Sequence, residues 1–426
     1  MILTILLSGH IAGWLESDDN GNPKLRYAST WLETPGAYPL SLSLPLTPRE
    51  FSSKTVSAVL WGLLPDNENL LQRWGARFHV SPRNPVALLS HVGEDCAGAV
   101  QFVNESRVES VLAGVDDQVV PLSDSELAER LRRLRQDNGM ARTVDDVGQF
   151  SLAGAQSKIA LLKQEDGSWA IPAGRIPTTH ILKPPGDDYE GFVENEMFCL
   201  RLAQEAGLPA ASVEKITVGT ETAICVSRYD RMRVGGSQIR LHQEDFCQSL
   251  GVMPQIKYQN QGGPGATELA DVLWQHSSQP RTDVGTLFQA LVFNFLIGGT
   301  DAHAKNYSLL FGTNGQIRLA PLYDISSALP YPQLQKRKIK MAMKIGSHYR
   351  WWDIRLEDWA ATAASLRLEP AQALHTLASM CLSLPDAARR VQRQLQHEGI
   401  IHPVLERLLH EIDRSCERCL DKFRIT

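Results

Sequence analysis

The sequence predicts an α+β fold in which an N-terminal α/β subdomain precedes a strand-rich lobe and a mostly helical lobe. Three observations support this. Residues 1–108 mix strand-like and helical runs, and the apolar runs of residues 149–229 are short and bounded by turn residues. Beyond residue 241 most apolar spacings are helical. We therefore predict an N-terminal subdomain (1–108), a connector (109–148), a strand-rich lobe (149–229) and a helical lobe (230–426).

The composition excludes several classes of protein. The chain has 426 residues, 43% hydrophobic and 21% charged, and a net charge of -5, which argues against disorder and against bulk binding to nucleic acid. No run approaches the roughly 20 apolar residues of a membrane helix, so no membrane partner is expected. Seven cysteines, an odd number at scattered positions, favour reduced thiols and a cytoplasmic location.

The N-terminal subdomain shows no catalytic constellation of its own. Residues 39–46 read P-L-S-L-S-L-P-L, an alternation that predicts an extended segment with one inward and one outward face. Two helices follow, at residues 56–64 and 67–78, separated by Pro65-Asp66. In the connector, residues 123–126 match a capping box, and the arginines of the following helix predict a solvated face.

The strand-rich lobe opens on a stretch that can bind an anion. Small residues at 153–155 interrupt two strand-like runs, and a tight turn there can bring backbone N–H groups together, although a plain hairpin turn is the alternative. A strand at 180–183 ends in Lys183, which can pair with nucleotide phosphates or lie on the surface. Glu196, on the helix at 194–206, could hold Lys183 or be solvated. Residues 227–229 fall where the chain would cross to the second lobe.

Residues 300–325 carry the strongest chemical signal. An apolar helix ends at Gly298-Gly299, and D-A-H-A-K-N follows at 301–306. Two strands, 307–311 and 316–320, then form a hairpin around the turn 312–315, which brings Asn306 and Asp324 to the same place. A carboxylate that accepts a hydroxyl proton, with an amide and a second carboxylate on Mg²⁺, is the set that phosphoryl transfer requires. The Asp301 to Asn306 spacing also matches the protein-kinase catalytic loop, although this spacing is common by chance.

In this order and spacing, these motifs resemble the HipA family of serine/threonine protein kinases, the toxins of HipBA-type bacterial toxin–antitoxin modules. The resemblance covers nearly the whole chain and implies a bilobal, protein-kinase-like fold. The matching motifs are residues 39–46, 63–66, 153–156 with Lys158, 180–183, 243–245, 262–265, 301–306 and 323–325.

The resemblance implies a role for each matched residue. Asp301 would be the catalytic base, Asn306 and Asp324 would hold Mg²⁺, and Ser151 would be autophosphorylated, which expels the phosphate loop and silences the kinase. The remaining ATP-binding residues would be Ala153, Gly154, Ala155, Gln156, Ser157, Lys158, Lys183, Ser227, Arg228, Tyr229, His303, Ala304, Lys305 and Tyr323, together with Asn306 and Asp324.

The resemblance also implies partners. These are a small HipB-like helix-turn-helix antitoxin, which makes most contacts to operator DNA, and a protein substrate such as an aminoacyl-tRNA synthetase, glutamyl-tRNA synthetase being the best-known target. Two residues depart from the best-known member. Ser157 replaces a glutamate of the phosphate loop, which makes a second autophosphorylation site conceivable, and Ser227 replaces an acidic hinge residue.

Three other functions fit parts of the pattern. Asp301-Ala302-His303 is a D-x-H as in some metal-dependent phosphoesterases, but those enzymes need further histidine and aspartate ligands. A small-molecule kinase would share the nucleotide site. A non-catalytic ATP-binding regulator in an antitoxin–DNA complex is the third, and the basic residues from Lys336 to Lys344 could then touch DNA, although a solvated loop is the simpler interpretation.

Overall fold

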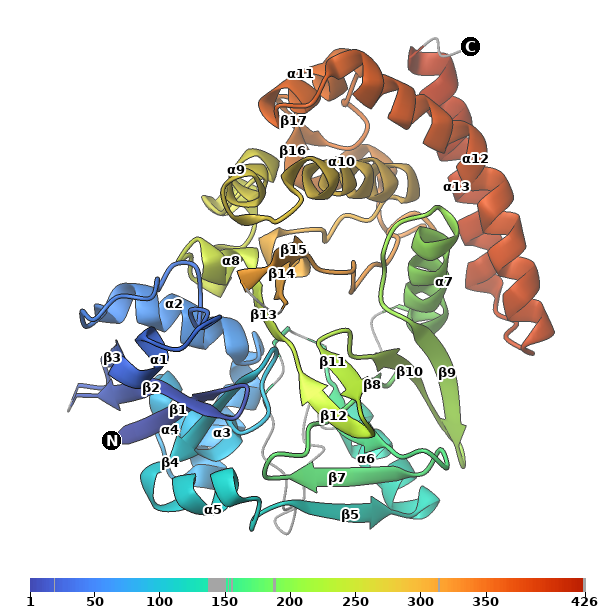
Figure 1. Ribbon diagram of the computed structural model, residues 1–426. Helices are drawn as coiled ribbons and strands as arrows, with labels where there is room; N and C mark the ends of the chain where they lie inside the picture. The colour runs from blue at the N-terminus through green and yellow to red at the C-terminus, as the bar shows by residue number, and fades with distance from the viewer. Residues whose placement is uncertain are drawn as a thin grey trace. The chain divides into compact units, whose positions relative to one another are not determined.

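The computed structural model (Figure 1) describes residues 1–18, 20–136, 151, 153–154, 156–186, 189–312 and 315–423. The chain divides into two compact units, neither of them continuous in sequence. Unit 1 comprises Met1–Pro184, Ile216–Gln255 and Leu309–Ile317, and unit 2 comprises Pro185–Lys215, Ile256–Ser308 and Arg318–Thr426. Within the described ranges, no helix is both long enough and apolar enough to cross a membrane. The combination of helices and sheets confirms the predicted α+β class.

Unit 1 begins with an antiparallel sheet in the order β3-β2-β1-β4 (Figure 1). Its strands are β1 (Ile2–Leu7), β2 (His10–Ser17), β3 (Pro23–Tyr27) and β4 (Val100–Asn104). Alternate residues of β1 enter different cores: Leu3, Ile5 and Leu7 join one cluster and Leu6 another. The helices of this part are α1 (Ser29–Leu32), α2 (Ser53–Leu63), α3 (Glu68–Phe78), α4 (Pro85–Val92) and α5 (Val108–Ala113).

Residues 39–46 are not an extended segment as predicted. They form a turn, in which the Leu44 N–H donates to the Ser41 carbonyl (2.9 Å). The serines point to protein rather than to water: the hydroxyls of Ser41 and Ser43 donate to the carbonyl of Gln248 (3.1 and 2.7 Å), and the Leu42 N–H donates to Glu244 (2.9 Å). Hydrogen bonds to Glu244 and Gln248, and not the alternation of leucine and serine, therefore determine the conformation of this segment. The motif at 39–46 is bound in this way to the motif at 243–245.

A six-stranded sheet follows, in the order β5-β7-β6-β8-β10-β9. Its strands are β5 (Gln118–Leu122), β6 (Ile159–Lys163), β7 (Trp169–Ala173), β8 (His180–Lys183), β9 (Val213–Val218) and β10 (Glu221–Ser227). The edge strand β5, inside the predicted connector, pairs antiparallel with β7 and was missed in the sequence. Four of its five residues are exposed and it contains Pro121, so it lacks the usual signal of a strand.

The connector helix α6 (Asp124–Gln136) begins with the predicted capping box. The Ser123 N–H donates to Glu126 Oε2 (2.8 Å), and the Glu126 N–H donates to the Ser123 hydroxyl (3.3 Å). Its arginine face is less solvated than predicted, because Arg135 donates to buried Glu221 of β10 (3.3 Å) and Arg130 is only 8% exposed. Residues 137–148 of the connector lie outside the described residues.

Unit 2 is mostly helical, and its last two helices are long and lie side by side (Figure 1). The helices are α7 (Phe192–Glu205), α9 (Ala266–His276), α10 (Pro280–Ile297), α11 (Leu356–Ser365), α12 (Pro370–His397) and α13 (Pro403–Phe423). A hairpin of β16 (Lys340–Ile345) and β17 (His348–Arg350) belongs to the same unit. Residues 290–297 of helix α10, the apolar helix predicted before Gly298-Gly299, are all buried, because α9, α12 and α13 surround it.

Candidate active site

The end of α10 creates the turn that precedes Asp301. Gly298 has φ +66°, and a side chain there would collide with Leu329. A Cβ on Gly299 would lie 2.2 Å from the Asn294 side-chain oxygen. Only glycine fits these two positions, so the chain leaves the helix sharply and delivers Asp301 to a loop.

Residues 301–306 close on themselves. The His303 N–H donates to the Asp301 carbonyl (2.8 Å), and the Asn306 N–H donates to the His303 carbonyl (2.9 Å). The Asn306 amide nitrogen also donates to the Asp301 carbonyl (2.8 Å). The amide oxygen, which is the atom that an Mg²⁺ ion would use, therefore lies on the other side of the amide group. His303, Ala304 and Lys305 are buried, whereas the Asp301 side chain is 59% exposed.

The predicted hairpin is present and leads back to the same loop. Its strands are β14 (Ser308–Phe311) and β15 (Ile317–Leu319), and the Ala320 N–H donates to the Ser308 carbonyl (2.8 Å). Thr313 and Asn314 of the predicted turn lie outside the described residues. After the hairpin, the Tyr323 hydroxyl donates to the Lys305 carbonyl (2.6 Å), which ties the two segments together.

Asp324 has an unusual backbone. Its φ of +56° is in the left-handed region, which costs a non-glycine residue energy and recurs at functional sites. Asp324, Asp301 and Asn306 line one small cavity. A carboxylate and an amide oxygen fit the hard-oxygen preference of Mg²⁺. Across the described ranges, no group of three or more His, Cys, Asp or Glu side chains is arranged to hold a metal, so the ligand set of the phosphoesterase alternative is not found there.

Tyr258 also lies beside Asp301, although the sequence did not predict this contact. The hydroxyl of Tyr258 is hydrogen-bonded to Asp301 Oδ1, and its ring packs edge-on against His303 at 4.9 Å between centroids. A lone tyrosine 43 residues before Asp301 carries no local signal. Only the tertiary structure brings it to the carboxylate.

The predicted phosphate loop lies in unit 1. Gly154 has φ +102°, and a Cβ there would lie 2.6 Å from the Lys158 ammonium, which itself donates to the Ala153 carbonyl (2.8 Å). The Gln156 side-chain nitrogen is buried with no hydrogen-bond partner among the described residues. The left-handed turn at Gly154, with the Gln156 side-chain N–H groups beside it, fits an anionic ligand such as a phosphate. Ala155, also assigned to ATP, lies outside the described residues.

The N-terminal subdomain holds this loop in place. Gly154 forms a parallel bridge with Pro65, and its carbonyl accepts from the Asp66 N–H (3.2 Å). Ser151 is fully buried; its hydroxyl donates to the Leu63 carbonyl (2.8 Å), and its N–H donates to the Asp95 carbonyl (3.0 Å). The motif at 63–66 is therefore a docking site for the loop.

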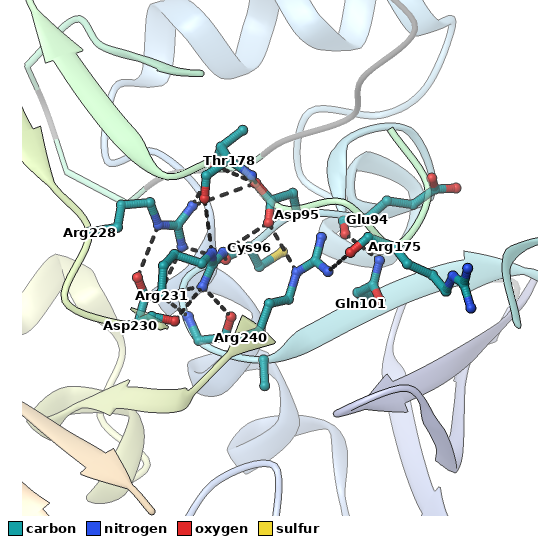
Figure 2. Close-up of polar contacts among 12 residues, drawn as sticks. Glu94, Asp95, Cys96, Gln101, Arg175, Thr178, Arg228, Asp230, Arg231 and Arg240 are labelled. Atoms are coloured by element: carbon teal, nitrogen blue, oxygen red, sulfur yellow. Dashed lines mark hydrogen bonds and ion pairs between the residues drawn. The ribbon is translucent and has the colours of Figure 1, made fainter. Parts of the chain in front are cut away.

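Asp95 also belongs to a buried ion network (Figure 2). Arg231 donates to Asp95 Oδ1 (2.8 Å), and Thr178 donates to Asp95 Oδ2 through its hydroxyl (2.5 Å). Arg228 donates to Asp230 (2.8 and 3.0 Å), and Arg240 donates to Asp95 (3.3 Å). Burial alone would raise the pKa of Asp95, but the three guanidinium groups outweigh it and hold that pKa well below its ordinary value.

The network limits what the predicted hinge can offer a nucleotide. The Arg228 N–H donates to the Thr179 carbonyl (2.9 Å), and the Arg228 side chain is only 2% exposed among the ion pairs. Tyr229 is hydrogen-bonded through its hydroxyl to Gln243. Ser227 ends β10 opposite His180 of β8, and Lys183 pairs with Ile224 in the same ladder. Lys183 is 6% exposed and so is not the surface lysine of the alternative, while Glu196 of α7 is 1% exposed and not solvated.

Comparisons with known proteins give one consistent result. Two family models match: the HipA N-terminal domain over residues 3–103 and the HipA-like C-terminal domain over residues 150–388. The candidate kinase Y4mE of Sinorhizobium fredii is 39% identical over 365 residues, which span 85% of each chain. The serine/threonine-protein kinase toxin HipA of Shewanella oneidensis is 29% identical over 385 residues, or 86% of this chain and 83% of that protein.

A solved structure supports the same relationship. The chain aligns with a chain of the Shewanella oneidensis complex of HipA, HipB and operator DNA, with a TM-score of 0.82 and 26% identity. The alignment covers 98% of this chain and 97% of the other. The agreement therefore extends over the N-terminal subdomain as well as the two lobes.

Proposed function

Because this chain belongs to the HipA family of kinases, we propose that it transfers the γ-phosphate of ATP to a serine or threonine of a protein. The observation that carries the proposal is the exposed carboxylate of Asp301, which lines the same cavity as Asn306 and Asp324. An accessible base beside two oxygen ligands for Mg²⁺ is the set that phosphoryl transfer needs.

In the proposed reaction, the substrate hydroxyl oxygen bonds to the γ-phosphorus as the bond from that phosphorus to the bridging oxygen breaks. The electron pair leaves with ADP, and the proton passes to Asp301. Mg²⁺, held by Asn306 and Asp324, would neutralise charge on the phosphates. Gly154 and its neighbours would cover the phosphates, Lys183 would pair with them, and Ser227 and Tyr229 would lie near the adenine.

We also propose that Ser151 is an autophosphorylation site that switches the enzyme off. The Ser151 hydroxyl donates to the Leu63 carbonyl in a fully buried position. A phosphoserine dianion cannot donate this bond, and its burial beside carbonyl oxygens would be costly, so the modified loop would leave its docking site. Ser157, which is half-buried, is the candidate for a second site.

The test is intact mass before and after incubation with Mg-ATP, for the wild type and for Asp301→Asn, with peptide mapping of any gain. Asp386→Asn on the exposed face of α12 is the matched control. We expect phosphate on Ser151 only where Asp301 is present. If ATP binds but neither the chain nor an added protein gains phosphate, a small-molecule kinase or a regulator would replace this proposal.

The proposed partners follow from the relatives. Alignment of nearly the whole chain with a complex of HipA, HipB and operator DNA supports a HipB-like helix-turn-helix antitoxin, with DNA bound mainly through that antitoxin. For the substrate we propose an aminoacyl-tRNA synthetase, glutamyl-tRNA synthetase first. Mass spectrometry of that synthetase after incubation with the kinase and Mg-ATP would test this. Seven free and buried cysteines support action in the cytoplasm.

A further inference from the structure

We propose that Tyr258 is a positioning residue for Asp301. Its hydroxyl holds Oδ1, so that the carboxylate presents Oδ2 to the hydroxyl group that attacks ATP. The inference rests on the proposed function, because it takes Asp301 as the base. The Gly-rich residues 262–265, one of the motifs matched in the sequence, would then have a specific task, which is to hold this tyrosine.

The carboxylate needs such a partner because it is exposed. The Asp301 side chain is 59% accessible, and an exposed aspartate otherwise samples several rotamers. A general base works only when its oxygen lies within hydrogen-bond reach of the proton that it accepts. The hydrogen bond from Tyr258 selects one rotamer before the substrate arrives.

The ring of Tyr258 is itself held. It packs edge-on against the imidazole of His303, with an interplanar angle of 89° and 4.9 Å between centroids. His303 is 3% exposed, and its Nε2 lies 3.9 Å from Asp301 Oδ1. Tyr258 and His303 thus both approach Oδ1, and Oδ2 is the oxygen that we assign to the substrate hydroxyl.

The backbone of Tyr258 is held by the glycines that follow it. Its carbonyl accepts from the N–H groups of Gln261 and Gly263, both at 3.0 Å. Gly262 has φ +92°, and a Cβ on Gly263 would lie 2.0 Å from the Ile256 carbonyl. The next residue, Gln259, accepts from the Lys344 N–H of β16 (2.8 Å). The tyrosine is therefore delivered by a closed turn anchored to a neighbouring hairpin.

The proposed role of Tyr258 does not alter which bonds form and break in the reaction. The proton of the substrate hydroxyl passes to Oδ2, the new oxygen–phosphorus bond forms, and ADP leaves with the electron pair. The phenol keeps its own proton throughout. Tyr258 is thus a positioning residue and not a second base.

Tyr258→Phe tests the role, because it removes the hydroxyl and keeps the ring on His303. We expect kcat for phosphate transfer to fall roughly 10- to 100-fold, since small misplacements of a catalytic group cost up to about that factor. The KM for ATP and the Tm should not change. Tyr349→Phe, which removes the same hydroxyl from β17, should leave kcat at the wild-type value.

A double-mutant cycle separates positioning from a general structural role. In an Asp301→Glu background the carboxylate is displaced, so adding Tyr258→Phe should cost little more. A kcat of Tyr258→Phe equal to or above that of the wild type would overturn the inference while the proposed function stands. An equal loss in both backgrounds would do the same. If the wild type transfers no phosphate, the proposed function fails and the inference falls with it.

Discussion

The predicted phosphate loop and the predicted catalytic loop are held in opposite ways. Ser151 and Gly154 are hydrogen-bonded to Leu63, Asp66 and Asp95, which lie 56 to 88 residues earlier in the chain. Residues 301–306 are closed by bonds among themselves, with further hydrogen bonds from Tyr323 to Lys305 and from Tyr258 to Asp301. The geometry of the predicted catalytic loop is therefore determined largely by its own residues, whereas that of the predicted phosphate loop depends on the N-terminal subdomain.

The largest change in activity is expected when the proposed base is removed and the fold is left intact. Asp301→Asn should reduce phosphate transfer by about 10²- to 10⁴-fold, the range of general base catalysis. Its Tm should stay close to that of the wild type, because the side chain is largely exposed. Rate measurements with thermal unfolding check both parts. Activity within threefold of the wild type would remove Asp301 from its role.

A second test disturbs the support of the phosphate loop. Asp95→Asn leaves three buried arginines short of a carboxylate, so the free energy of unfolding should fall by about 3–5 kcal/mol. Asp117→Asn is the matched control, because Asp117 pairs with Arg175, whose side chain is 52% exposed, and such pairs contribute about 0–1 kcal/mol. Chemical denaturation measures both variants. Equal losses in the free energy of unfolding would show that the buried ion network stabilises the protein no more than an exposed ion pair does.

A third test alters the phosphate loop alone. Gly154→Ala puts a Cβ into the strained φ of +102° and against the Lys158 ammonium, so we expect ATP affinity to fall about tenfold, or ~1.4 kcal/mol. Gly167→Ala carries comparable strain at φ +85° but meets open space in the turn between β6 and β7. Its ATP affinity should be unchanged in calorimetric titration. Equal losses of ATP affinity in the two variants would mean that backbone strain, and not the position of Gly154 beside Lys158, is responsible.

We also expect a pH dependence from the segment that holds residues 39–46. Burial raises the pKa of Glu244 to about 8, against the opposing effect of the Ser41 hydroxyl and the Leu42 N–H. The folded state therefore binds more protons than the unfolded chain between pH 4.5 and 8, and stability falls as pH rises through that window. The slope is at most about 1.4 kcal/mol per pH unit for one group.

Glu244→Gln should remove this slope, because glutamine stays neutral at every pH. Denaturation at pH 5, 6.5 and 8 compares the two proteins, with Glu398→Gln as an exposed control. The wild type and Glu398→Gln should lose stability in parallel as the pH rises, and Glu244→Gln should lose less. An unchanged slope in Glu244→Gln would assign the dependence to other groups.

The catalytic hairpin was predictable because its determinants are neighbours. Gly298-Gly299, the two strands and the tie between Asn306 and Asp301 all act within a few residues, and the capping box before α6 is equally local. Strand β5 and the turn at 39–46 were not predictable. The first is exposed and contains proline, and the second is shaped by Glu244 and Gln248, about 200 residues later.

The α+β class and the short motifs could be predicted from the sequence, because hydrophobic period, caps and loop spacing act over a turn or two of chain, and the resemblance of those motifs indicated the family. The contacts that these motifs make depend on the tertiary structure. The docking of Ser151, the buried arginine network and the contact between Tyr258 and Asp301 join groups 43 to 145 residues apart. Hydrogen bonds between such distant groups depend on the packing of the whole unit, which no local pattern encodes.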